Sequence, residues 1–308
     1  MQPNNIIAEF EQALNQQDIS PLTRRGYLQD LRQFGNWFEQ NSGEPFAPEA
    51  VTPTDIREYR QYLQVTLRRK ANSINRKLAA ISAFFRWAMK AGLISSDPTK
   101  DVKSVRQTTV APRWLTKQEQ YALQRAIEKD LQLSKLRYPK RWVTRRRDAS
   151  LTLFLLNTGL RLSEARNLAI EDIQISERKG SLLVRNGKGN KQRRVPLNSQ
   201  ARKAVQEWLE VRPETASEYL WVAVEGEVDG LSGRAIQRIL ARYGQETGLE
   251  GFTPHVARHT FAKNLVDSGV GLEKVASLLG HANLNTTRVY ITPSEHDLEL
   301  AVERLGEQ

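Results

Sequence analysis

The sequence predicts a mainly α-helical protein with one small β-sheet, divided into two domains. Apolar side chains recur at helical spacing through the first hundred residues. A stretch around residue 105 lacks this period and contains a proline, which is typical of a linker. Farther on, two strand-like segments flank Asn186-Gly187, a strong hairpin signal. We therefore predict an all-helical domain over residues 1–104, a linker over 105–113 and a larger mixed α+β domain over 114–308.

Turn and cap residues set the expected helix ends in the first domain. Ser20 and Thr52 are good N-caps, and each is followed by a proline, which favours the first helical position. Gly92 is a stop signal after the last of these helices. The expected helices run over 5–15, from 21, from 53 and over 73–91.

The larger domain is expected to begin with a helix capped by Thr116. Residues 181–185 and 192–197 form the two predicted strands. The remaining segments carry helical periodicity, over 148–158, 163–169, 199–211, 232–247, 254–268, 272–279, a short helix from 285 to 290 and a tail from 295.

Composition indicates the class of partner. The 308 residues include 46 Lys and Arg against 35 Asp and Glu, a formal net charge of +11. Such a surplus favours polyanions, of which nucleic acid is the commonest. The absence of cysteine excludes disulfides, thiolate metal sites and cysteine nucleophiles. No signal-peptide pattern or membrane-length apolar run occurs, so a cytoplasmic protein with no membrane association is expected.

Two clusters of cations are candidates for DNA contact. Residues 131–147 contain no acidic residue and interleave cations with two aromatic residues. This segment is interpreted either as a phosphate-contacting loop or as a solvated surface insertion, and both interpretations stay open. The second cluster surrounds the start of the fourth helix, where DNA contact competes with simple solvation. The DNA-binding candidates are Arg68, Arg69, Lys70, Arg76, Lys77, Lys140, Arg141, Arg145 and Arg146.

A cationic site is predicted where Thr253-Pro254-His255 opens a helix. Arg258 lies three residues after His255 and shares its helix face, next to a helix N-terminus that favours anions. His259 is expected to face elsewhere and to be a packed structural histidine. The i, i+4 spacing of the two histidines also occurs in zinc helices, but Arg258 between them would repel a dication. We therefore predict no metal.

Four further residues are candidates for the site, and each is weak evidence when taken alone. His281 directly follows the helix stop Gly280, and Tyr290 ends the short helix that starts at 285. Arg161 lies in the turn after a helix stop at 159, and Lys188 lies at the hairpin tip between two glycines. Each could be an ordinary surface or core residue.

Taken together, four motifs resemble the tyrosine recombinase family, in its Xer and phage or transposon integrase branch. They are TGLRLSE, GKGNKQRRVPL, HVARHTFA and LLGHANLNTTRVY, and the resemblance covers residues 112–295. The helical N-terminal domain resembles, more loosely, the family's core-binding, SAM-like DNA-binding domain. The basic segment 131–147 is longer than in compact Xer members, which leaves the subfamily open.

The resemblance implies a site-specific recombinase that cuts and rejoins DNA through a 3′-phosphotyrosine intermediate and a Holliday junction. Tyr290 is then the nucleophile, and Arg161 and Arg258 bind the non-bridging oxygens. His255 is the expected general base and Lys188 the general acid, with Lys191 as the alternative acid. His281 donates to the phosphate, while Glu164 orients the site. No cofactor is expected, because the covalent ester conserves the phosphodiester free energy.

The expected partner is a double-stranded DNA recombination site. The resemblance further implies a homotetramer on two duplexes, assembled through the tail from 295, although that tail could pack on its own domain. A second recombinase or an accessory protein remains possible. Whether the reaction serves integration, excision, transposition or dimer resolution stays open. Two alternatives are a DNA-relaxing enzyme of the type IB topoisomerase kind and a catalytically silent DNA-binding regulator.

Overall fold

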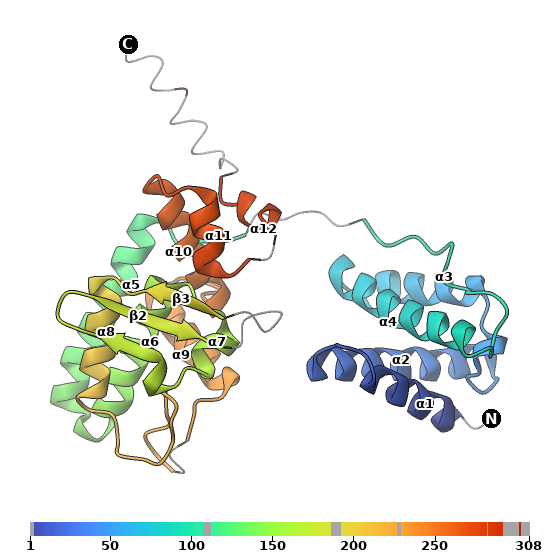
Figure 1. Cartoon of the computed structure of the whole chain (residues 1–308), viewed down its shortest axis with the longest axis horizontal. Coiled ribbons are helices and arrows are strands. Elements are labelled where there is room, and N and C mark those ends of the chain that lie inside the picture. The colour runs from blue at the N-terminus through green and yellow to red at the C-terminus, as the bar shows by residue number, and fades with distance from the viewer. Residues whose placement is uncertain are drawn as a thin grey trace. The chain divides into compact units, whose positions relative to one another are not determined.

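The computed structural model describes residues 3–106, 112–185, 192–226, 229–281, 283–291 and 302. The chain divides into two compact units, residues 1–110 and 111–308. Figure 1 shows a helical N-terminal unit and a C-terminal unit in which helices surround a small sheet. Within the described residues, no helix combines the length and the apolar character needed to span a bilayer.

The N-terminal unit is a helical bundle, as predicted. Ser20 and Thr52 cap their helices through side-chain oxygens that accept backbone N–H groups. Aromatic side chains fill the core, among them Phe34 and Phe84, which are both fully buried. The elements are α1 (Pro3–Asn15), α2 (Pro21–Ser42), a 3-10 helix (Pro48–Ala50), α3 (Pro53–Gln61), a π-helical turn (Tyr62–Thr66) and α4 (Ala71–Lys90).

The expected linker is partly incorporated into the two units. Both backbone groups of Val105 are hydrogen-bonded to the Asn75 side chain, at 2.8 and 2.9 Å. On the other side, Arg113 forms an ion pair with Glu119 at 3.2 Å. Val105 therefore belongs to the first unit and Arg113 to the second.

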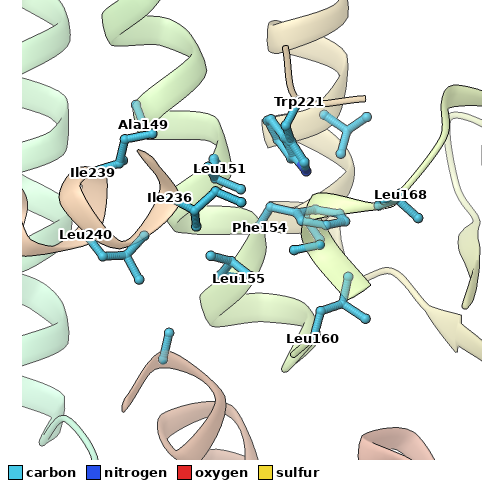
Figure 2. Packing of buried hydrophobic residues seen from close by; sticks show 14 of the residues in the cluster. Ala149, Leu151, Phe154, Leu155, Leu160, Leu168, Trp221, Ile236, Ile239 and Leu240 are labelled. Atoms are coloured by element: carbon cyan, nitrogen blue, oxygen red, sulfur yellow. The ribbon is translucent and has the colours of Figure 1, made fainter. Parts of the chain in front are cut away.

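The C-terminal unit is built around α6, which packs against α5, α8, α9 and α10. Figure 2 shows the apolar side of α6, including Phe154 and Leu155, packed against Ile236 and Trp221 from later in the chain. The helices are α5 (Lys117–Arg137), α6 (Trp142–Thr158), α7 (Leu162–Arg166), α8 (Ser199–Leu209), α9 (Gly233–Thr247), α10 (Pro254–Asp267), α11 (Leu272–Leu279) and α12 (Asn285–Arg288), with 3-10 turns at Pro139–Arg141 and Ile170–Asp172.

The sheet has three antiparallel strands in the order β1-β2-β3, one more than predicted. Leu182 of β2 pairs with Ile173 on one side and with Val195 on the other. The strand that sequence analysis missed is only three residues long, too short for a period-two signal. The strands are β1 (Ile173–Ile175), β2 (Gly180–Val184) and β3 (Arg193–Pro196).

Two helix predictions need correction. Helix α6 begins at Trp142, six residues before the expected start at 148, and α7 ends at Arg166 instead of 169. Residues 142–147 lack an apolar stripe because three of them are arginines. The predicted hairpin loop and the tail from 295, apart from Val302, lie outside the described residues.

Candidate active site

The end of helix α11 is surrounded by guanidinium groups. Three successive carbonyls there each accept a hydrogen bond from a different arginine, at 2.8 to 2.9 Å. These carbonyls carry the negative end of the helix dipole, which favours cations at this position. The pairs are Arg193 with Leu278, Arg258 with Leu279 and Arg161 with Gly280.

Two glycines make this arrangement possible. Gly159 and Gly280 end α6 and α11 in the left-handed conformation, with φ of 61° and 65°. A Cβ atom at Gly159 would lie 2.4 Å from Phe261, and one at Gly280 would lie 2.9 Å from the Arg193 guanidinium. The Gly159 carbonyl also accepts from Arg258, at 2.7 Å. Both helix ends therefore require glycine and both supply a carbonyl to an arginine.

Glu164 is the carboxylate bound by two of these arginines. Arg193 binds it in a fork, at 2.9 and 2.8 Å, and Arg161 adds one guanidinium bond and its backbone N–H, both at 2.8 Å. Burial by itself raises the pKa of Glu164, but the hydrogen bonds from Arg193 and Arg161 outweigh it and lower that pKa to about 2. Glu164 is thus an ionised, buried anchor.

The hydroxyl of Tyr290 contacts His259, the histidine to which sequence analysis assigned a structural role. The His259 Nδ1 atom lies 2.7 Å from the Tyr290 oxygen. Four residues turn an α-helix by about 400°, so His259 lies only about 40° around α10 from His255. The expectation that His259 faces elsewhere is therefore wrong. His255 is exposed, and no described residue hydrogen-bonds its ring.

Burial controls the ionisation of this cluster. Tyr290 is 1% exposed and Arg258 is 4% exposed. Burial raises the pKa of Tyr290, although nearby Arg258 acts in the opposite direction. Burial also lowers the pKa of Arg258 to about 10, with Arg161 adding to the effect. For His259, burial and then the positive charges of His255 and Arg258 lower the pKa to about 4. At neutral pH the phenol and the imidazole are therefore both uncharged.

His281 lies immediately beyond the end of α11. Its Nδ1 atom is 2.9 Å from the hydroxyl of Thr287, which is fully buried on α12. Burial, followed by the charges of Arg258 and Arg161, lowers the pKa of His281 to about 4. The contact fixes one ring nitrogen of a neutral imidazole close to the three arginines.

The structure thus brings together Arg161, Glu164, Arg258, His281 and Tyr290 in the C-terminal unit. Lys188, the predicted general acid, and its alternative Lys191 lie outside the described residues. The sequence patterns did not indicate a role in the site for His259, Thr287 and Arg193. The strand period could have identified Arg193, because it lies on the same face of β3 as the buried Val195.

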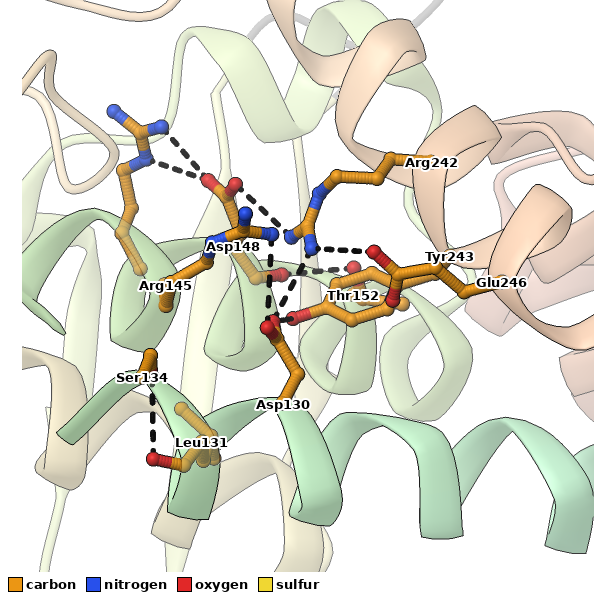
Figure 3. Close-up of polar contacts among 10 residues, drawn as sticks. Asp130, Leu131, Ser134, Arg145, Asp148, Thr152, Arg242, Tyr243 and Glu246 are labelled. Carbon is orange, nitrogen blue, oxygen red and sulfur yellow. Dashed lines mark hydrogen bonds and ion pairs between the residues drawn. The ribbon is translucent and has the colours of Figure 1, made fainter. Parts of the chain in front are cut away.

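The basic segment 131–147 does not form a loop. Helix α5 continues to Arg137 and α6 begins at Trp142, so the prediction of a loop is wrong, while contact of this segment with phosphate stays a prediction. Two of its arginines join an ion network between α5, α6 and α9, which we call the corner network (Figure 3). Its members are Asp130, Arg145, Arg147, Asp148, Arg242, Tyr243 and Glu246.

Acidic partners inside the protein neutralise some of the DNA-binding candidates. Arg145 pairs with Asp130 at 3.6 Å, and Arg146 pairs with Glu207 at 2.7 Å while lying over the Trp142 ring. Lys140 and Arg141 remain exposed in the turn before α6. That turn lies at the opposite end of α6 from Gly159, and a 17-residue helix spans about 25 Å.

The N-terminal candidates differ in the same way. Arg68, Arg69 and Lys70 are exposed just before α4. Lys77 is buried, and its amine donates to Asp30 at 2.9 Å and also to Gln33. Arg76 shares Asp30, with its side chain 55% exposed. Lys77 therefore presents no free cation to DNA, because its charge is balanced inside the bundle.

Comparisons with known proteins match both units of the chain. Residues 113–296 match the family described as "Phage integrase family", and residues 6–94 match "Phage integrase, N-terminal SAM-like domain". The chain is 31% identical to Tyrosine recombinase XerC of Syntrophus aciditrophicus, over 98% of this chain and 97% of the relative. It is 33% identical to Tyrosine recombinase XerA of Thermococcus kodakarensis, over 98% and 96%.

Solved structures share the fold. The XerH site-specific recombinase in its post-cleavage complex with palindromic difH substrate superposes with a TM-score of 0.73, at 23% identity, over 91% of this chain and 79% of that one. The Tn1549 transposon integrase in complex with transposon right end DNA superposes with a TM-score of 0.72, at 20% identity, over 99% of this chain and 100% of that one. Because both domain models match and the relatives are similar over nearly their full length, the chain belongs to the phage integrase family of tyrosine recombinases.

Proposed function

We propose that this site-specific tyrosine recombinase cleaves DNA with Tyr290 as its nucleophile. One observation carries the assignment: the Tyr290 hydroxyl contacts a neutral histidine, beside a cluster of three arginines in which the described residues place a single carboxylate. Such an excess of fixed positive charge suits the extra negative charge of a pentacoordinate phosphorane. The matched relatives are recombinases, which does not favour a topoisomerase or a silent regulator.

The reaction is a transesterification. The Tyr290 oxygen forms a bond to the scissile phosphorus while the bond from phosphorus to the 5′-oxygen breaks. The phenolic proton passes to a histidine, and the leaving oxygen receives a proton from Lys188, whose role rests on the sequence motif alone. Arg161 and Arg258 bind the non-bridging oxygens. Each guanidinium uses two of its five N–H groups to contact described residues, which leaves donors for phosphate. Rejoining is the same step reversed.

His259 is the residue best placed to take the Tyr290 proton. The 2.7 Å contact meets the distance criterion for a general base, and the ring is neutral at pH 7. His255, the base expected from the motif, is exposed at the first turn of α10 and suits contact with the phosphate. Because Tyr290 is 1% exposed, DNA binding must uncover it before attack.

A nicked suicide substrate tests the nucleophile. Wild type should form a protein–DNA adduct that survives SDS, and Tyr290→Phe should form none. Tyr243→Phe is the matched control, since Tyr243 is equally buried in the same unit but donates to Asp130. An adduct with Tyr290→Phe, or none with wild type, would refute the proposal.

The proton acceptor is tested separately. His259→Ala should slow cleavage and remove an inflection from the pH–rate profile. His255→Ala should instead slow cleavage by weakening the stabilisation of the charged phosphate. If only His255→Ala changes the pH profile, the base is His255, as the motif implied.

Assembly as a homotetramer through the tail from 295 also remains a proposal, as do accessory partners. Truncation after Ile291 should leave cleavage of the suicide substrate intact and weaken synapsis of two duplexes on native gels. Unchanged synapsis would place the assembly contacts elsewhere.

A further inference from the structure

Two adjacent arginines on β3 have contrasting surroundings. The Arg193 side chain is 12% exposed and points towards the site, whereas Arg194 is exposed and donates to Gln174 and Ser181 on the sheet. Successive residues of a strand face opposite sides, so the pair differs in position but not in charge. Arg194 is therefore a natural control for Arg193.

Arg193 links three parts of the site. Its two terminal nitrogens hold both oxygens of Glu164, and its Nε donates to the Leu278 carbonyl at 2.9 Å. Its guanidinium also lies against Gly280, where a Cβ would approach within 2.9 Å. The same residue begins the strand that leaves the hairpin loop. Glu164, the end of α11 and the base of the hairpin thus meet at one side chain.

The charge balance shows what Arg193 contributes. Without it, Glu164 would be a buried carboxylate paired with Arg161 alone. A carboxylate with one arginine partner takes that guanidinium in a fork and neutralises its charge. With Arg193 in the fork position, Arg161 makes only one guanidinium bond to Glu164 and keeps its side chain 24% exposed.

We infer that Arg193 is a positioning residue for DNA cleavage, which neutralises Glu164 so that Arg161 retains its charge and orientation for the scissile phosphate. The inference rests on the proposed function, because it assumes that Arg161 binds a non-bridging oxygen. Arg193 acts through Glu164 and Arg161 and does not itself touch the phosphate.

The experiment compares two suicide substrates in single turnover, one with a normal scissile phosphate and one with a neutral methylphosphonate there. On the phosphate, Arg193→Gln should slow cleavage by about tenfold to hundredfold, less than loss of a direct oxyanion donor. On the methylphosphonate the loss should shrink to about threefold or less, because the charge that Arg161 neutralises is gone. Arg194→Gln should match wild type on both substrates.

A purely structural role predicts a different pattern. Equal losses on the two substrates, or no loss on the phosphate, would overturn the inference while wild-type cleavage still upheld the nucleophile. If wild type cleaves neither substrate, the proposed function itself fails. If Arg193→Gln no longer unfolds cooperatively on heating, Arg193→Lys is used in its place. The cleavage rate of Arg193→Lys must then also fall less on the methylphosphonate than on the phosphate.

A second substitution tests the same inference through the partner. In Arg193→Gln, the further change Glu164→Gln removes the carboxylate that competes for Arg161. The double variant should then cleave the phosphate several-fold faster than Arg193→Gln alone. A double variant that is slower still would contradict the charge argument, since no carboxylate remains to neutralise Arg161.

Discussion

Helix α6 separates two arginine-rich clusters of the C-terminal unit that use their charge differently. At its end, Arg161 and Arg193 share the carboxylate of Glu164, the one carboxylate that the described residues place there. Their other contacts, and both contacts of Arg258, are with backbone carbonyls. Near its start, the corner network sets Arg145, Arg147 and Arg242 against Asp130, Asp148 and Glu246 (Figure 3). Carbonyl acceptors orient an arginine without cancelling its charge, whereas carboxylates cancel it. Only the first cluster therefore keeps a surplus for phosphate.

The largest expected difference between the clusters is catalytic. Arg258→Lys should slow single-turnover cleavage by about a hundredfold or more, because an ammonium cannot hold the Gly159 and Leu279 carbonyls and a phosphate in one plane. Arg145→Lys, in the corner network, should stay within about threefold of wild type. Comparable losses for both variants would show that the duplex reaches the corner network.

The free energy of unfolding should depend more on the corner network than on exposed ion pairs, although the cleavage rate should not depend on this network. Arg147→Met leaves the buried carboxylate of Asp148 without its nearest guanidinium and removes the donor to the Val222 carbonyl, so it should lower the unfolding free energy by about 3 kcal/mol. Glu246→Gln removes a partner whose side chain is 40% exposed and should cost less than about 1 kcal/mol. Denaturant titration measures both. An Arg147→Met protein as stable as wild type would mean that the network contributes little to folding.

The two clusters should respond oppositely to acid. His259 has a folded pKa of about 4, below its ordinary 6.5, so the unfolded chain binds its proton first and stability falls as pH drops from 6.5 towards 4. Burial raises the pKa of Asp148 from 3.8 to about 6 despite the opposing Arg147, so this group adds stability as pH falls through 6. Between pH 7 and 5, His259→Asn should therefore lose less stability than wild type, and Asp148→Asn should lose more. Parallel slopes would contradict these shifts.

The smallest effect is expected at the exposed turn before α6. Replacing Lys140 and Arg141 with alanine should change cleavage by less than about twofold, since the turn is a helix length from Gly159. Replacing Arg68, Arg69 and Lys70 should weaken DNA binding and reduce its salt dependence. Filter binding across a salt series compares the two sets. If the first set lowers the salt slope as much as the second, both surfaces contact DNA.

Local signals predicted much of the fold. Ser20, Thr52 and Thr116 cap the helices that they were expected to cap, because a side-chain oxygen at this position accepts a backbone N–H wherever the rest of the chain lies. The early start of α6 was missed because residues 142–147 are held by ion pairs with distant residues such as Asp130 and Glu207 instead of by an apolar stripe. Such pairs leave no period in the sequence.

The sequence by itself sufficed to identify the family, through four ordered motifs that contain Arg161, Lys188, Arg258, His281 and Tyr290. Only the tertiary structure decided how they are used. In the folded protein, His259 contacts the Tyr290 hydroxyl and Arg193 binds Glu164. Arg145 and Lys77 form ion pairs with carboxylates inside the protein. The physical reason is that an arginine or lysine carries the same charge everywhere in a sequence. Whether that charge remains available depends on the acceptor that folding brings within hydrogen-bonding distance.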